Sequence, residues 1–293
     1  PESIKAVLAI YPKSEHFQVL SMKDVDGWTA LHCVARSNNP ESIEFILGLY
    51  PESERKYVMN IQDQSGTVLH AAARSAHLES LKTVLRMYPE SERLQAVRMP
   101  DHRGRTALHH ATNSRRLECL KYLLSLYPES ERAHAVSIPD RGGWTVLHCA
   151  ARSGKLEAIQ TVLALYTEAH LLRTLNVTNG AEESVLHCAV DSKEVECIKA
   201  VLSRYPESER LQAVRMADDA GWTALHCAAR LGNLEAIETI LAVYPESERL
   251  QALNRTTHNG ETVLHLVAGS NNIECITAVL SLYPESQRLE AAN

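Results

Sequence analysis

The sequence lacks several features that mark membrane proteins and cofactor-binding enzymes. No stretch of the 293 residues approaches the roughly 18 consecutive apolar residues of a membrane-spanning helix, so we expect no membrane insertion. Neither common Gly-rich phosphate-binding motif occurs, and no Cys-x-x-Cys pair of the zinc-binding kind is present. We therefore expect neither a metal nor any small-molecule cofactor.

An excess of basic charge is also missing. The 30 Lys and Arg are outnumbered by 36 Asp and Glu, and a net charge of -6 argues against a nucleic-acid-binding protein, which needs a basic face. The seven cysteines are an odd number in a long chain, which suits a reducing compartment better than a disulfide framework. No secretory leader is recognisable. We therefore expect a cytoplasmic protein.

Phenylalanine is nearly absent, with 2 residues against 10 Tyr, and an internal repeat explains this imbalance. Tyr recurs at positions 11, 50, 88, 127, 166, 205, 244 and 283, and seven of these eight residues precede Pro. The dipeptide Leu-His keeps the same period, 38 and then 39 residues, at Leu31-His32, Leu69-His70, Leu108-His109, Leu147-His148, Leu186-His187, Leu225-His226 and Leu264-His265. Two independent markers in one register predict a repeat array.

Each repeat opens at an Asp-like turn, which defines the domain organisation. Residues 1–23 align with the later part of a repeat and are predicted to be a partial N-terminal copy. Seven repeats follow, the fifth of them irregular, at 24–62, 63–100, 101–139, 140–178, 179–217, 218–256 and 257–293. We expect them to form one continuous solenoid domain. Because the array begins inside a repeat, and with Pro1 rather than Met, we expect a fragment of a longer chain.

Residues 218–256 show what one repeat builds. Asp218 to Gly221 has the composition of a type I turn, and Thr223 suits the N-cap of a short first helix. A second helix with apolar residues at helical spacing follows and ends at Pro245, where Pro-Glu-Ser-Glu-Arg predicts a short third helix. No repeat contains an alternating run of strand length. The predicted fold class is therefore all-α, a solenoid of stacked helix pairs with a short third helix in each repeat.

The block Asp-x-x-Gly-x-Thr-x-Leu-His-x-Ala-Ala resembles the ankyrin repeat, most clearly from Asp140 to Ala151 and from Asp218 to Ala229. The family's Thr-Pro-Leu-His reads here as Thr-Ala-Leu-His or Thr-Val-Leu-His, and the period of 39 residues exceeds the family's usual period of about 33. The additional residues lie in the Tyr-Pro-Glu-Ser-Glu-Arg segment, so we expect the family's hairpin fingers to be reduced to turns.

The resemblance also implies a function. Ankyrin arrays are intracellular scaffolds that bind another protein on their concave face and perform no chemistry themselves. Arrays with this long and regular period also resemble those in proteins that intracellular bacteria deliver into host cells, which would place the chain in a host cytoplasm. The main alternative is that the array is the targeting or substrate-binding region of a larger enzyme, whose active domain would lie outside these residues.

Histidine and cysteine recur at fixed places, which raises the weaker alternative of a hydrolase with a Cys-His pair. The seven motif His lie one repeat apart, so we expect each to bond with the Thr three residues earlier rather than to share one site. The seven Cys occupy positions that hold other packing residues in other repeats. They are Cys33, Cys119, Cys149, Cys188, Cys197, Cys227 and Cys275. We therefore assign no catalytic residue and expect no enzyme.

Two positions that vary between repeats are the candidates for binding a partner protein. The position after the turn Gly holds Trp28, Arg105, Trp144 and Trp222, and the position four residues after the motif His holds Arg36, Arg74, Arg152 and Arg230. The resemblance places both positions on the concave face, and Trp and Arg are enriched in binding hot spots. We predict that these eight side chains contact a partner, with Trp-Arg stacking inside a repeat as the structural alternative. The Pro-Glu-Ser-Glu-Arg segments vary little and are expected to be a solvated face.

Overall fold

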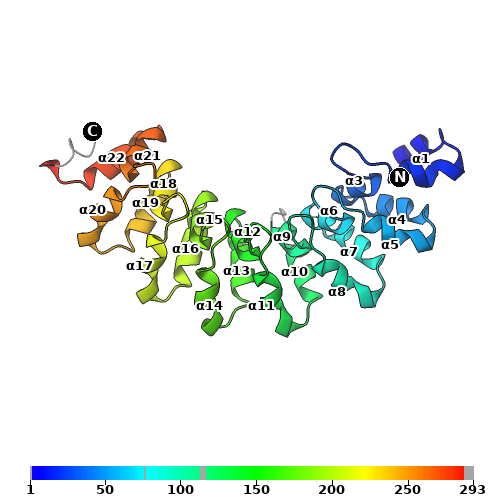
Figure 1. Cartoon of the computed structure of the whole chain (residues 1–293), viewed down its shortest axis with the longest axis horizontal. Coiled ribbons are helices and arrows are strands. Elements are labelled where there is room, and N and C mark those ends of the chain that lie inside the picture. The colour runs from blue at the N-terminus through cyan, green and yellow to red at the C-terminus, as the bar shows by residue number, and fades with distance from the viewer. Residues whose placement is uncertain (1, 76, 113–116, 287–293) are drawn as a thin grey trace. The chain divides into compact units, whose positions relative to one another are not determined.

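The computed structural model describes residues 2–75, 77–112 and 117–286, whose helices are labelled in Figure 1. Within these ranges every element of regular structure is helical, apart from three isolated β-bridges. The all-α repeat-solenoid fold predicted from the sequence is confirmed, with a third helix in the first six repeats; the third helix predicted for the seventh lies largely outside the described residues. No helix in the described part of the chain has both the length and the apolar character needed to span a membrane.

Three helices recur along the chain. The first helices are α3 (Ala30–Arg36), α6 (Val68–Arg74), α9 (Ala107–Thr112), α12 (Val146–Arg152), α15 (Val185–Asp191), α18 (Ala224–Arg230) and α21 (Val263–Gly269). The second helices are α4 (Pro40–Gly48), α7 (Leu78–Arg86), α10 (Glu118–Ser125), α13 (Leu156–Leu163), α16 (Val195–Ser203), α19 (Leu234–Leu241) and α22 (Ile273–Ser281). The third helices are α5 (Glu52–Met59), α8 (Glu90–Arg98), α11 (Glu129–Ser137), α14 (Glu168–Leu175), α17 (Glu207–Arg215) and α20 (Glu246–Asn254).

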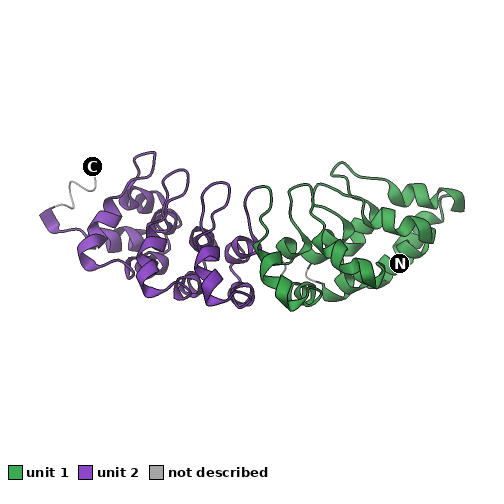
Figure 2. Cartoon of the chain, turned by 60° about the horizontal axis from the view of Figure 1, so that its bottom comes forward, with its two compact units in different colours: residues 1–141 green, residues 142–293 purple. Residues whose placement is uncertain are grey.

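The chain forms two compact units, residues 1–141 and 142–293, which are coloured separately in Figure 2. The first unit opens with α1 (Glu2–Leu8), the 3-10 helix η1 (Lys13–Glu15) and α2 (His16–Ser21). In both units the core lies between first and second helices, and their facing apolar side chains are fully buried. Burial of this apolar surface stabilises the stack, since no single repeat can cover its own apolar face.

The motif His links the first helix of its repeat to the segment that ends that repeat, and His70 also reaches the next repeat at the carbonyl of Arg105, 3.1 Å away. The Nδ1 atom of His70 accepts hydrogen bonds from the backbone N–H and the hydroxyl of Thr67, at 3.0 and 2.9 Å. Its Nε2 atom donates to the backbone carbonyl of Met99 at 3.0 Å, which requires the proton to be on Nε2 because a carbonyl can only accept. The predicted Thr-His bond recurs in every full repeat. These histidines are structural caps.

The Tyr-Pro-Glu-Ser-Glu-Arg segment anchors the third helix to the rest of the stack. The Tyr205 hydroxyl donates to the carbonyl of Leu175, at the end of the preceding third helix, at 2.9 Å. The segment's Arg reaches backwards, so that Arg93 Nε donates to the carbonyl of Leu85 at 3.1 Å and to that of Tyr88 at 3.3 Å. A cation placed there satisfies the last carbonyls of the second helix and interacts favourably with its dipole.

Neighbouring third helices are also joined by charge pairs across the surface. Arg98 pairs with Glu131 in the first unit, and Arg215 pairs with Glu248 in the second. These side chains are between one third and one half exposed, so each pair is worth at most about 1 kcal/mol. The Pro-Glu-Ser-Glu-Arg segments are therefore nearly identical because they bond to neighbouring helices as well as facing solvent.

The loops that open the repeats are turns, as predicted, and no strand occurs among the described residues. Within each unit these loops lie side by side (Figure 2). A single backbone hydrogen bond joins one turn to the next, as from Arg141 N to the carbonyl of Arg103 at 2.8 Å and from His258 N to the carbonyl of Ala220 at 2.9 Å. The turns thus hold one another in register without a β-ladder.

Candidate functional site

Each of the three tryptophans stacks with the arginine of its own repeat. The guanidinium carbons of Arg36, Arg152 and Arg230 lie 4.4, 5.1 and 5.2 Å from the ring centroids of their tryptophans. The three arginines are exposed, whereas Trp28, Trp144 and Trp222 are only half-buried. The Trp-Arg stacking inside a repeat, which the sequence offered as the structural alternative, is therefore present in these three repeats. Each stack therefore presents the positive charge of an arginine beside the edge of an aromatic ring.

In the second unit two of these stacks are joined through an acidic residue. Arg152 lies 3.2 Å from Asp191, and Arg230 lies 3.3 Å from the other carboxylate oxygen of the same residue. The Asp191 side chain is only 11% exposed, so water screens these pairs less than at an open surface. We call the series Trp144, Arg152, Asp191, Arg230 and Trp222 the Trp-Arg ladder.

Asp191 was not among the residues predicted to bind a partner, although the sequence contains the signal for it. It stands four residues after the motif His, where both neighbouring repeats have Arg. A third Arg there would place three cations in one row, whereas a carboxylate neutralises and orients both neighbours. Glu183 adds a weaker pair with Arg152 at 3.6 Å.

The predicted residues of the first unit do not form such a ladder. Arg105 occupies the tryptophan position, but its Nε donates to Asp140 Oδ2 at 2.8 Å, so it is committed to an internal ion pair. Arg74 is exposed at the end of α6, in the repeat that has no residue between Gly66 and Thr67. The eight candidate residues thus divide into three stacks, one internal ion pair and one exposed arginine.

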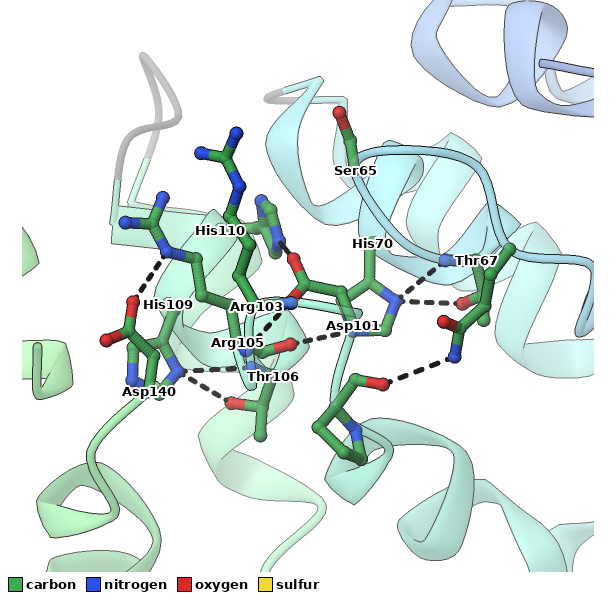
Figure 3. A network of polar contacts seen from close by, with 12 residues as sticks. Ser65, Thr67, His70, Asp101, Arg103, Arg105, Thr106, His109, His110 and Asp140 are labelled. Atoms are coloured by element: carbon green, nitrogen blue, oxygen red, sulfur yellow. Dashed lines mark hydrogen bonds and ion pairs between the residues drawn. The ribbon is translucent and has the colours of Figure 1, made fainter. Parts of the chain in front are cut away.

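A buried polar network lies between the second and third repeats (Figure 3). His110 Nε2 donates to Asp101 Oδ2 at 2.9 Å, and Asp101 Oδ1 accepts the backbone N–H groups of Arg103 and Arg105, each at 2.8 Å. Burial opposes ionisation of Asp101, but these hydrogen bonds outweigh it and hold its pKa at about 2. Burial, together with the nearby His110, lowers the pKa of His70 to about 4. At neutral pH the network therefore holds a carboxylate and a neutral His70.

The cysteines are poorly suited to nucleophilic chemistry. Burial raises the pKa of Cys119 to about 11 and that of Cys227 to about 12, and it also raises the pKa of Cys188. Cys33 is exposed, yet partial burial raises the pKa of its thiol too. Because the thiolate is the reactive form, these shifts disfavour reaction at neutral pH. Across the described ranges, no three His, Cys, Asp or Glu side chains are grouped to hold a metal ion.

Comparison with known proteins agrees with the architecture. A family model of ankyrin repeats matches in three copies, over residues 3–93, 92–173 and 167–249. A search of curated proteins gives no match. The matched ranges together cover most of the chain, and they carry no information on a secreted, effector-like origin.

Proposed function

The chain belongs to the ankyrin repeat family, and from this premise we propose that it is an interaction module whose turns and first helices bind another protein. Ankyrin repeats are generally protein-interaction modules without chemistry of their own. The observation that supports a specific site is the Trp-Arg ladder of the second unit, in which Asp191 joins two Trp-Arg stacks.

The ladder suits binding because its side chains are held in place before a partner arrives. Arg152 and Arg230 each have an aromatic ring on one face and a carboxylate on one edge. An unrestrained arginine loses about 0.5–1.5 kcal/mol of rotamer entropy on binding, and much of that loss has already occurred here. The half-buried tryptophans add apolar area beside the cations, a combination typical of binding hot spots.

We also propose that these residues take no part in catalysis and that the protein acts in the cytoplasm. The same function fits a longer chain in which the array directs an enzyme to its substrate, including an effector acting in a host cytoplasm. The ladder would then bind the substrate protein. Mass spectrometry of the native protein distinguishes these arrangements, because a larger enzyme has sequence outside these 293 residues.

The experiment is to capture a partner from cell lysate with the full chain and then titrate it against two double variants. Trp144→Ala with Trp222→Ala removes the aromatic part of the ladder. Glu207→Gln with Glu246→Gln alters the exposed third-helix surface and serves as the matched control. We expect the tryptophan variant to bind at least about 30-fold more weakly, as loss of a hot spot of about 2 kcal/mol implies.

Thermal unfolding must accompany the titrations, because a tryptophan that stacks on its own arginine also stabilises the fold. If the tryptophan variant remains folded and binds as tightly as the parent while the glutamate variant loses affinity, the ladder is structural. The third-helix surface would then be the binding site.

A further inference from the structure

A second surface, in the first unit, differs in charge from the ladder. We call it the arginine turn face, and it consists of the turns and first helices at residues 63–74, 101–112 and 140–141. All three of its acidic side chains are buried, with Asp63 7%, Asp101 4% and Asp140 7% exposed. The exposed charged side chains of this face are Arg74, Arg103 and Arg141, and His102 is exposed beside them. The face therefore presents positive charge on a protein whose net charge is -6.

Internal bonding keeps two of the carboxylates of this face, those of Asp101 and Asp140, away from solvent. Asp101 accepts two turn N–H groups and His110, and Asp140 accepts Arg105. In Figure 3 the side chain of Arg103 makes no drawn contact, whereas that of Arg105 reaches Asp140. The turns thus retain their structural aspartates but leave cations at the surface.

The turns of the second unit provide the contrast. Glu182 and Asp219 are exposed there, and the arginines Arg152 and Arg230 are paired with Asp191. The arginine turn face and the turns of the second unit therefore differ in charge character, and the first repeat's turn, with Asp24 and Asp26 exposed, lies outside that face. A ligand that recognised features common to all repeats would bind both sets of turns equally. An anionic ligand would prefer the arginine turn face.

Resting on the function proposed above, we propose that the arginine turn face binds an extended acidic segment of the partner protein, with carboxylates at every second residue. The spacing follows from the stack. Arg103 and Arg141 lie on adjacent turns, joined by the backbone bond between them. That bond keeps the backbones of the two arginines within about 7 Å of each other, and in an extended chain residues i and i+2 share one face about 6.6 Å apart, so alternate residues match adjacent turns.

A peptide fits this surface better than a nucleic acid does. A nucleic acid presents a continuous row of phosphates and needs a basic surface along its length. The arginine turn face offers a few separated guanidinium groups, which suit separate carboxylates because Arg can bind each one with two parallel hydrogen bonds. The exposed acids Asp24 and Asp26 lie on the neighbouring turn, where the Asp26 carbonyl accepts the N–H of Gln64, and they would oppose a longer polyanion.

The test uses the full chain and a fluorescent peptide of Glu-Ser repeats about 8 residues long, which is about 26 Å when extended at 3.3 Å per residue. One control peptide has Gln for Glu, and another has the same glutamates in one block. Anisotropy titrations at low salt compare the parent with Arg103→Gln/Arg141→Gln. The matched control variant is Arg173→Gln/Arg204→Gln, which alters two exposed arginines outside the turns, and Arg103→Lys/Arg141→Lys restores the charge. Thermal unfolding verifies that each variant is folded.

We expect the spaced Glu peptide to bind, the Gln peptide not to bind and the blocked peptide to bind more weakly. The Arg103/Arg141 glutamine variant should lose about tenfold in affinity, since each exposed pair contributes up to about fivefold. The Lys variant should recover part of the lost affinity. The control variant should change the affinity by less than about twofold, because its charges lie away from the site.

Three results would overturn the inference. They are absence of binding by the spaced peptide, equal loss in the control variant, and tighter binding of a single-stranded oligonucleotide of equal charge. These outcomes are separate from failure of the Trp-Arg ladder. If a captured partner needs Trp144 and Trp222 but is indifferent to Arg103 and Arg141, the proposed function stands and the acidic-segment inference fails.

Discussion

At the scale of single residues, the opening turns require a left-handed backbone at their fourth position. Gly143 and Gly221 satisfy this requirement with φ of 79°, whereas the fifth repeat places Glu182 there with φ of 59°. A residue with a Cβ atom in this conformation costs about 1 kcal/mol relative to Gly. Since the Glu182 side chain is exposed, it gains little packing in return.

Replacing Glu182 by Gly should therefore raise the free energy of unfolding by about 1 kcal/mol, measured by urea denaturation. Gly221→Ala is the converse control, because its Cβ would lie 2.8 Å from His258 Cδ2 and 2.9 Å from His258 N in addition to the strained φ. That variant should be destabilised. A less stable Glu182→Gly protein would contradict the expectation.

His70 makes stability depend on pH in a defined direction. Its folded-state pKa of about 4 lies below the ordinary value of 6.5, so below pH 6.5 the unfolded chain binds a proton that the folded protein does not. Stability should fall as the pH drops from 6.5 toward 4, by about 2 kcal/mol at pH 5 from this residue alone. Urea denaturation at pH 7 and pH 5 measures the difference.

The His70→Gln variant separates this contribution from that of the other buried histidines. It should be less stable at pH 7 but lose less stability between pH 7 and pH 5 than the parent does. Burial also lowers the pKa of His32, His187 and His226, so some pH dependence will persist. An identical pH dependence in parent and variant would exclude His70 as a source.

At the scale of elements, the third helix is held mainly by Tyr and Arg rather than by a large apolar face. Most third helices bury only two residues of their own. The Tyr that precedes each one is buried, and in several repeats its hydroxyl bonds to a group at the end of the preceding third helix, as Tyr205 does to Leu175 and Tyr244 to Val214. This role accounts for the preference for Tyr over Phe, because Phe would leave a buried carbonyl unpaired.

Tyr205→Phe should accordingly lower the free energy of unfolding by about 1–2 kcal/mol, although the ring remains. Tyr57→Phe is the matched control, since Tyr57 is 65% exposed and its substitution should change stability by less than about 0.5 kcal/mol. Thermal unfolding of both variants gives the comparison. Equal effects would show that the Leu175 bond does not stabilise the third helix.

At the scale of the whole molecule, stability is the sum of repeat stabilities and of the interfaces between neighbours. The irregular fifth repeat keeps most of its bonds. Asn179 Oδ1 still accepts the N–H groups of Ala181 and Glu183, and Ser184 still bonds to His187. Its remaining weaknesses are the strained Glu182 and the replacement of Pro by Thr167 before α14.

We therefore predict that cooperativity within the second unit breaks first at this repeat. Hydrogen exchange should show amides around residues 167–184 opening before those around residues 206–223, which form the corresponding junction of the next repeat. Equal protection of the two segments would refute the prediction.

The sequence by itself was sufficient for the period, the three helices of each repeat, the opening turns and the Thr-His cap. These features depend on residues close together in the chain, such as Thr67 and His70. Only the tertiary structure revealed that Arg105 is committed to Asp140, that Asp191 joins two arginines and that the tryptophans are half-buried. These contacts join residues 35–39 positions apart, so each depends on which side chain the neighbouring repeat presents and on how closely the repeats stack. The local motif is nearly the same in every repeat, so it does not specify these contacts between repeats.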